Sequence, residues 1–316
     1  MKKILLFLVI LFMVAVPVIH SAQTYTVSIT QIVEHPSLDA MREGFKNRLK
    51  ESGIDVIYNE HIAQGNQATN IQIANQIKGE NPELILAITT PSSQAVAQKI
   101  KDIPILFTGV TDPVAAGLVK SLMQPGKNIT GMTDMSPILR QVELIKEFLP
   151  SVKSIGTIYN AGEANSVVLI TLLKEVCKDF GISVEEASIA NSSGVYQAAK
   201  SLVGKCDAIY IPLDNTVVSG LESAIKVCRQ NKLPIFSADT DSVERGTVAA
   251  IALDYYRMGM QTADMAARIL SGKAKPADMP VESLQNLRLY VNEKAAATMG
   301  VAIPRQIMER ADRVIK

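Results

Sequence analysis

Cysteine and histidine are both scarce in this sequence, which has three of each. The cysteines (Cys177, Cys206 and Cys228) form no C-x-x-C pair, and the histidines show no zinc-ligand spacing. We therefore expect neither a metal site nor a cofactor. Cys177 and Cys228 share apolar helix faces with leucine or isoleucine and are expected to be buried thiols. An oxidising compartment would permit a disulfide, but an odd number of cysteines gives no basis for pairing them.

An excess of charge of either sign is also lacking. Lys and Arg together number 32 and Asp and Glu 31, which gives a formal net charge of +1. Because a nucleic-acid-binding domain carries a basic excess, this balance argues against nucleic-acid partners. Hydrophobic residues make up 47% of the chain and charged residues 20%, a composition that favours a packed core over disorder.

The sequence lacks the common catalytic and nucleotide-binding motifs. It has no G-x-S-x-G, no H-E-x-x-H and no G-x-x-x-x-G-K-[ST], and no G-x-G-x-x-G follows its first predicted strand. No nucleophile–base pair stands at a predicted strand end, and His35 and His61 are expected to be polar surface or rim residues rather than bases. These absences favour a binding protein over an enzyme.

A long apolar run is present at the start of the chain, where it has the form of an export signal. Lys2 and Lys3 precede the apolar stretch 4–18, and Ala22 supplies a small residue before Gln23. The run has ~15 residues, whereas a spanning helix needs ~20; an N-terminal membrane anchor is the alternative. No cysteine follows the run, so no lipid anchor is indicated. We expect residues 1–22 to be a cleavable signal peptide and the mature protein to lie in the periplasm.

Short apolar runs alternate with helical patterns after residue 22. A helix over 37–52, for example, places Leu38, Met41, Phe45 and Leu49 on one face and ends before Gly53. Strands that alternate with helices of this length predict parallel α/β units. The predicted strands are 25–30, 54–60, 84–89, 105–108, 154–159, 184–188, 208–213, 235–237 and 247–253.

The second half of the chain repeats the order of the first. GIDV at 53–56 matches GISV at 181–184, and PILF at 104–107 matches PIFS at 234–237. A Thr-Asp pair follows each of the latter two segments, at 111–112 and at 240–241. Because 316 residues also fit two domains, each half is interpreted as one doubly wound α/β lobe.

Polar side chains follow the predicted strands in both halves. The ligand crevice of an open parallel sheet lies beyond the carboxyl ends of its strands, and a helix N-terminus there suits a ligand carboxylate. Hydroxyl donors for such a carboxylate stand at Ser92, Ser93 and Ser166. Carboxylates that could accept from an ammonium group stand at Glu34, Asp214 and Asp239. Each residue alone also fits an ordinary N-cap, but their recurrence in both halves predicts a cleft between two lobes.

Several longer segments are distinctive in combination. Those of the first half are EHPSLDAMREGF, PELILAITTPSSQAVAQK, IPILFTGVTDPVAAGLV and PGKNITGMTD. Those of the second half are IGTIYNAGEANS, IYIPLDNTVVSG and LPIFSADTDSVERGTVAAIALDYY. Together they resemble the ABC-transporter substrate-binding family that includes tryptophan- and tyrosine-binding proteins, over essentially the whole mature chain. The resemblance implies a type I periplasmic-binding fold, with two parallel-sheet lobes joined by three crossovers, and no catalysis.

The resemblance also implies a division of the chain and a set of site residues. The first lobe would comprise 23–134 and 240–283, and the second 135–239 and 284–316. The implied ligand-binding residues of the first lobe are Glu34, Thr90, Ser92, Ser93, Thr111 and Asp112. Those of the second lobe are Asn160, Asn165, Ser166, Asp214, Asn215 and Asp239.

The expected function is that of the solute-binding component of an ABC transporter, a monomer that meets membrane permease subunits. An aromatic amino acid, or a similar small zwitterion, is the expected ligand. A planar ligand favours an aromatic stacking partner, and Tyr159 is the aromatic residue among the strand ends considered. The alternatives are a binding protein that feeds a membrane receptor and a binder of a sugar or nucleobase.

Overall fold

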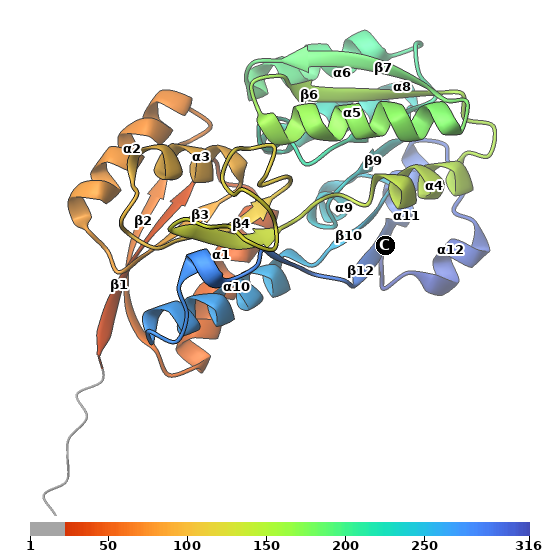
Figure 1. Ribbon diagram of the computed structural model, residues 1–316. Coiled ribbons are helices and arrows are strands. Elements are labelled where there is room, and N and C mark those ends of the chain that lie inside the picture. Colours follow the sequence, from red (N-terminus) through yellow and green to blue (C-terminus); the bar gives the residue numbers. More distant parts are fainter. Residues whose placement is uncertain (1–22) are drawn as a thin grey trace, which may run out of the picture.

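The computed structural model describes residues 23–316, and the predicted signal peptide over 1–22 lies outside the described residues. Two separate apolar cores organise the molecule (Figure 1). Buried side chains from 27–132 and 253–279 form the core of the first lobe, and those from 138–249 and 289–307 form the core of the second. The chain therefore passes between the lobes three times, and the predicted fold of two lobes joined by three crossovers is confirmed.

The first lobe is built on a parallel sheet with the strand order β11-β5-β4-β3-β1-β2. Its strands are β1 (Thr24–Gln31), β2 (Asp55–Ile62), β3 (Leu84–Ile88), β4 (Ile105–Val110), β5 (Ile129–Thr133) and β11 (Glu282–Ser283). Its helices are α1 (Pro36–Glu51), α2 (Gln67–Glu80), α3 (Thr90–Lys99), α10 (Tyr255–Leu270) and the short η2 (Pro276–Asp278). The residues of β3 and β4 are buried throughout, as expected for strands covered by helices on both faces.

The second lobe contains a parallel sheet with the order β7-β6-β8-β9, beside a smaller sheet with the order β10-β12-β13. Its strands are β6 (Ser154–Asn160), β7 (Ser183–Ile189), β8 (Ala208–Ile211), β9 (Ile235–Ser237), β10 (Ala249–Leu253), β12 (Leu287–Asn292) and β13 (Arg313–Ile315). Its helices are α4 (Ile138–Phe148), α5 (Ala164–Asp179), η1 (Ser192–Gly194), α6 (Val195–Leu202), α7 (Asn215–Ser219), α8 (Leu221–Asn231), α9 (Asp241–Arg245), α11 (Glu293–Thr298) and α12 (Arg305–Arg310).

The smaller sheet departs from the expected all-parallel lobe and from the expected lobe boundary. Strand β10 pairs antiparallel with β12, and the Val248 N–H donates to the Ile235 carbonyl of β9 at 2.7 Å. Val248 and Ala249 accordingly belong to the core of the second lobe, while Leu253 belongs to that of the first. The second crossover thus lies between 249 and 253, later than the boundary at 239/240 that the sequence suggested.

All nine predicted strands form, but β5, β11, β12 and β13 were not predicted. Strand β5 reads ITGMT and contains a glycine, and β11 has two residues, so neither carries a strong strand signal. Three of the six residues of β12 are only partly buried, and one of these, Arg288, is charged, which weakens the apolar alternation of the strand.

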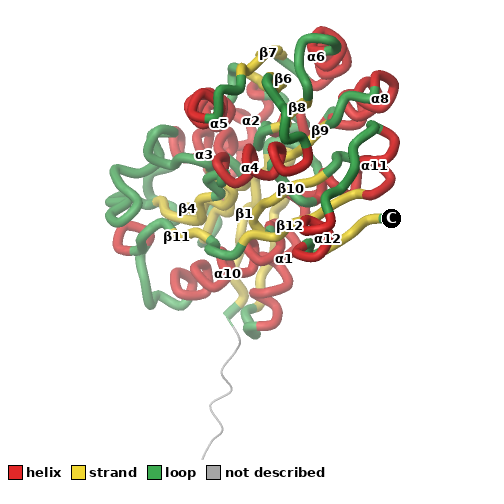
Figure 2. Tube along the Cα trace, turned by 90° about the vertical axis from the view of Figure 1, so that its right-hand side faces the viewer, coloured by secondary structure: helices red, strands yellow, loops and turns green. Residues whose placement is uncertain are grey.

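Helices α1 and α10 of the first lobe pack closely against each other, and Figure 2 shows them side by side. Glycines permit this approach from both sides. A Cβ added at Gly44 of α1 would overlap the Tyr256 carbonyl of α10. A Cβ added at Gly259 of α10 would overlap the Met41 carbonyl of α1. The contact therefore depends on backbone meeting backbone without side chains between them.

The three cysteines are free and buried, as expected for Cys177 and Cys228. Burial is the main cause that raises the pKa of the Cys177 and Cys206 thiols to about 11 and that of Cys228 to about 12.

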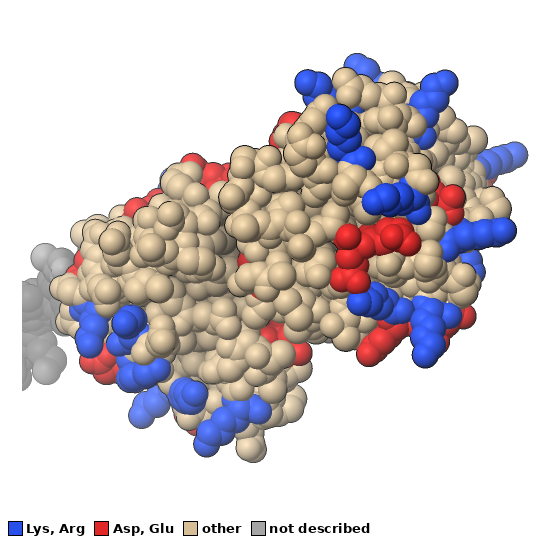
Figure 3. All heavy atoms as spheres, turned by 90° about the horizontal axis from the view of Figure 1, so that it is seen from above, with Lys and Arg blue, Asp and Glu red and all other residues tan. Residues whose placement is uncertain are grey.

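Among the described residues, no group of three or more His, Cys, Asp or Glu side chains is placed to hold a metal ion. No helix within 23–316 combines the length and hydrophobicity needed to cross a membrane. On the face shown in Figure 3, both signs of charge gather over the right-hand part and the lower left, and the surface between them is mostly uncharged.

Candidate functional site

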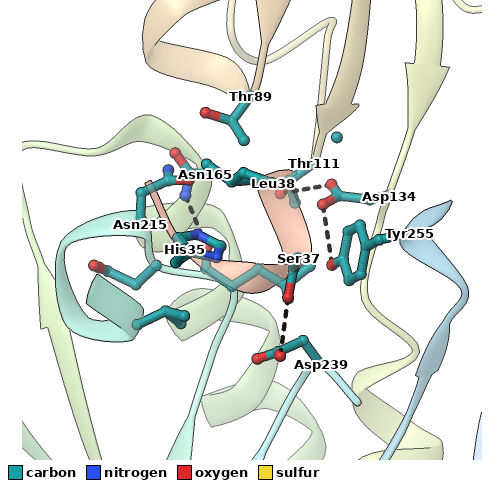
Figure 4. A pocket seen from close by; sticks show the side chains of 14 residues that line it. His35, Ser37, Leu38, Thr89, Thr111, Asp134, Asn165, Asn215, Asp239 and Tyr255 are labelled. Carbon is teal, nitrogen blue, oxygen red and sulfur yellow. Dashed lines mark hydrogen bonds between the residues drawn. The ribbon is translucent and has the colours of Figure 1, made fainter. Parts of the chain in front are cut away.

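A cavity with about 360 Å³ of empty space lies between the two lobes, at the carboxyl ends of their strands (Figure 4). The first-lobe core or the loops beside it supply His35, Ser37, Leu38, Thr89, Gly109, Thr111, Asp134 and Tyr255. The second lobe supplies Asn165, Leu213, Asp214, Asn215, Val218 and Asp239. Neither lobe forms the site alone.

Helix starts bring many of these residues to the cavity. His35 precedes α1, which begins with Pro36, and Tyr255 is the first residue of α10. Thr89 precedes α3 with φ +70°, a conformation that is strained for a residue other than glycine. Helices α1, α3 and α10 are each long enough for their unpaired N-terminal N–H groups to favour negative charge nearby.

Asp214 is held by donors from its own lobe. Its carboxylate accepts from the backbone N–H of Asn160 at 2.6 Å, the Ser166 hydroxyl at 2.7 Å and the Val217 N–H at 2.8 Å. The last bond makes Asp214 the N-cap of α7. Burial, followed by repulsion from the neighbouring Glu163, raises the pKa of Asp214 to about 7.

Asp239 connects the two lobes. It accepts from the backbone N–H of Ser242 at 2.8 Å and from the Ser242 hydroxyl at 2.7 Å, both within the second lobe. The Ser37 hydroxyl of α1, in the first lobe, donates to the same carboxylate at 3.1 Å, as drawn in Figure 4. This bond exists only where the lobes are close together.

Asp134 lies in the first crossover, directly after β5. It accepts from the Thr111 hydroxyl at 3.2 Å and from the Tyr255 hydroxyl at 3.4 Å, and Figure 4 shows both bonds. Burial raises the pKa of Asp134 to about 6, although the hydroxyls of Thr111 and Tyr255 act in the opposite direction.

Three polar atoms of the cavity residues are buried without a hydrogen-bond partner in the protein: Nδ1 of His35, Oγ1 of Thr89 and Oδ1 of Asn165. A buried polar atom without a partner is destabilising, and such atoms usually have a partner. Burial, with a smaller effect of Arg245, lowers the pKa of His35 to about 3, so its ring is neutral at physiological pH. The three atoms are free to bond a polar ligand.

Five of the twelve residues singled out from the sequence line the cavity, namely Thr111, Asn165, Asp214, Asn215 and Asp239. Two more support one of them, since the Asn160 N–H and the Ser166 hydroxyl both bond the Asp214 carboxylate. Thr90 is buried in the first turn of α3, beside the cavity residue Thr89.

The remaining four use their polar atoms locally or at the surface. Ser92 donates to Asn70 at 3.4 Å, and Ser93 donates to the Thr89 carbonyl at 2.7 Å. Asp112 accepts from the backbone N–H groups of Val114 and Ala115. Glu34 is exposed and accepts from Gln64. These four residues follow strands, as the lining residues do, so the sequence does not distinguish the two groups. In the structure, their polar side chains bond local groups instead of facing the cavity.

Nine of the lining residues are not among those predicted from the sequence: His35, Ser37, Leu38, Thr89, Gly109, Asp134, Leu213, Val218 and Tyr255. His35 was expected at the surface or rim but is buried, because the second lobe covers it. Asp134 follows β5, a strand without a strong sequence signal, and Tyr255 follows β10 at the start of α10. Tyr159, the aromatic residue at the end of a predicted strand, donates its hydroxyl to Glu186 and does not line the cavity; Tyr255 does.

The amino-acid sequence matches a known family over nearly the whole chain. A family model described as ABC transporter substrate binding protein matches residues 26–315. The chain belongs to this family. It is 40% identical to the tyrosine-binding protein of Clostridioides difficile (strain R20291) over 277 residues, which are 86% of this chain and 80% of that protein. The family consists of solute-binding proteins rather than enzymes.

Two solved structures of relatives differ in their ligand state. An ABC domain in complex with L-Trp from Streptococcus pneumonia is 33% identical, with 93% of this chain and 100% of that chain covered and a TM-score of 0.89. A ligand-free, open substrate-binding protein with adhesive properties from Clostridium difficile is 39% identical, with 92% and 99% covered and a TM-score of 0.69. The substrate-binding protein described here is thus closer in shape to the complex, although it is closer in sequence to the open structure.

Proposed function

We propose that this substrate-binding protein closes around an aromatic amino acid and presents it to the permease of an ABC transporter. The observation that carries the proposal is the cavity between the lobes, which combines buried carboxylates, unpartnered polar atoms and apolar side chains. A zwitterion with an apolar side chain complements all three. The relatives support the same ligand class, since one is named a tyrosine-binding protein and another was solved with L-Trp.

The parts of such a ligand match different sides of the cavity. The ligand carboxylate fits the side of Thr89, whose unpartnered hydroxyl stands at the N-terminus of α3. The aromatic ring fits against Leu38, Leu213 and Val218, with Tyr255 as the aromatic neighbour. His35 and Asn165 can bond a polar atom of the ligand, such as an indole N–H or a phenol hydroxyl.

Closure follows from this division of the site. A ligand that bonds residues of both lobes stabilises the arrangement in which the lobes approach, and it cannot do so when they are apart. The Ser37–Asp239 hydrogen bond contributes to the same arrangement. The predicted signal peptide over 1–22 and the periplasmic location complete the proposal, because a permease receives its solute on that side of the membrane.

Titration calorimetry of ligand-free protein tests the ligand class. We expect saturable, one-to-one binding of L-tryptophan or L-tyrosine, or of both, and no heat of binding with D-glucose or adenine at the same concentrations. The neutral sugar and the nucleobase are the matched controls, because they offer hydrogen bonds without an ammonium group. Binding of glucose or adenine, with none of the amino acids, would contradict the proposal and leave the fold unaffected.

A further inference from the structure

The three carboxylates that line the cavity differ in how many hydrogen bonds they accept from the protein. Asp214 and Asp239 each accept three hydrogen bonds, at 2.6–2.8 Å and 2.7–3.1 Å, and each accepts at least one from a backbone N–H. Asp134 accepts two side-chain bonds, both longer and both from hydroxyls. A carboxylate offers about four acceptor positions, so Asp134 has the most capacity left for a ligand.

Asp134 also lacks a compensating charge. Asp134 is only 5% exposed, and no lysine or arginine of the described chain lines the cavity. His35 cannot supply the charge, because its ring is neutral. The acidic groups near Tyr255, which are Asp239 and Asp241, add negative charge on the side of the second lobe. A buried, ionised carboxylate without a cationic partner is strongly unfavourable.

We propose that Asp134 is the residue that binds the ammonium group of the ligand, an assignment that rests on the proposed function. The hydroxyls of Thr111 and Tyr255 hold its carboxylate in place while leaving acceptor positions open toward the cavity. The unpartnered atoms of Thr89 and Asn165 in the same cavity independently point to a ligand with polar groups. Asp214 and Asp239 then serve the protein itself, as the cap of α7 and as the contact between lobes.

The position of Asp134 gives the assignment a further consequence. The residue lies in the first crossover, between the last core residue of β5 and the start of α4, and Tyr255 lies just after the second crossover. An ammonium group bound at Asp134 is therefore attached to the segments that join the lobes.

Deamino analogues isolate the ammonium contact. The test compares L-tyrosine with 3-(4-hydroxyphenyl)propionate, and L-tryptophan with indole-3-propionate, by calorimetry on the wild type and on Asp134→Asn. We expect the wild type to prefer the amino acids by about 100-fold or more, since leaving one member of a buried charge pair alone is costly. In Asp134→Asn this preference should fall below about tenfold, because the neutral amide no longer distinguishes ammonium from hydrogen.

Two matched variants serve as controls. Asp214→Asn and Asp239→Asn each remove a carboxylate from the same cavity. In each variant, the logarithm of the affinity ratio between the amino acid and its deamino analogue should remain at least half of the wild-type value. Asp134→Glu keeps the charge but displaces it by one methylene; it gives a second readout if Asp134→Asn does not fold, and it should lower the preference at least tenfold.

The outcomes separate the two proposals. A wild type that binds neither amino acid overturns the proposed function and, with it, the assignment. A wild type that binds them while Asp134→Asn and Asp134→Glu keep the full preference overturns the assignment alone. A preference that is lost in Asp239→Asn or Asp214→Asn, and kept in the Asp134 variants, places the ammonium at that other carboxylate.

Discussion

Burial sets the ionisation of the side chains around the cavity. Desolvation disfavours the charged form of any group, so it lowers the pKa of His35 to about 3 and raises that of Asp134 to about 6. Burial and the charge of Asp239 likewise raise the pKa of Asp241 to about 6. The histidine and the aspartates therefore affect the pH dependence of stability in opposite directions.

The sign for His35 is that of a base whose pKa is lower in the folded state. Below pH 6.5 the unfolded chain takes up a proton at His35, while the folded protein does not until about pH 3. The free energy of unfolding should therefore fall by about 2–3 kcal/mol between pH 7 and pH 4.5 because of this residue. Urea unfolding of the wild type and of His35→Asn at both pH values measures this contribution of His35 to stability.

The comparison of the two proteins isolates the histidine. Asp134, Asp214 and Asp241, whose pKa values are raised, stabilise the folded state as the pH falls, and they do so equally in both proteins. The gap in stability between the wild type and His35→Asn should therefore shift in favour of the variant at pH 4.5. A gap that is the same at both pH values contradicts the burial of a neutral imidazole.

At the scale of elements, the packing of α1 on α10 decides the shape of the first lobe beside the cavity. Both helices carry residues of the site near their N-termini, Ser37 and Leu38 on α1 and Tyr255 on α10. A change in the distance between the two helices would displace these residues relative to each other. Gly44 and Gly259 are therefore positions where packing and site geometry meet.

Gly259→Ala tests this contact. The added methyl group would overlap the Met41 carbonyl, and backbone cannot move aside as a flexible side chain can. We expect a loss of about 3 kcal/mol or more in the free energy of unfolding, at the upper end of overpacking effects. Gly79→Ala in α2 is the control, because nothing lies within 4 Å of the added Cβ.

Alanine also has the higher helix propensity, so Gly79→Ala should leave the stability unchanged or raise it by up to about 1 kcal/mol. Thermal and denaturant unfolding report both variants. Equal stabilities for Gly259→Ala and Gly79→Ala would mean that α1 and α10 do not pack backbone to backbone.

At the scale of the whole molecule, the two cores and the three crossovers between them allow the lobes to change their arrangement as bodies. The site is divided between the lobes, and Ser37 and Asp239 bond across the division. The overall shape is closer to that of the relative solved with L-Trp than to that of the ligand-free, open relative. Ligand binding is then expected to change the shape of the molecule more than its internal structure.

Small-angle scattering measures that change. We expect the radius of gyration to decrease when L-tryptophan or L-tyrosine is added to protein shown by mass spectrometry to start ligand-free.

Ser37→Ala removes the donor of the bond between the lobes and should weaken binding by about fivefold, the effect of one hydrogen bond. An unchanged radius, in a sample that binds the ligand by calorimetry, would count against closure.

Much of the architecture was determined by the sequence alone. The alternation of apolar runs with amphipathic helices and the repeat between the two halves predicted an α/β molecule, and the family resemblance supplied its two lobes with three crossovers. Local signals suffice for this, because strand and helix patterns follow from residues near one another in the chain. The rule that ligands lie beyond the carboxyl ends of parallel strands predicts a crevice at the edge of the sheets where the structure has its cavity.

The tertiary structure decided which polar side chains face the cavity. Asp112 and Asp214 both follow strands and both cap a turn or helix, yet only Asp214 lines the site, because the opposite lobe lies over it. Asp134 and Tyr255 belong to the site because crossovers carry β5 and β10 to the junction of the lobes. Such juxtapositions join residues more than a hundred positions apart, as in Tyr255 and Asp134, and no local pattern encodes them.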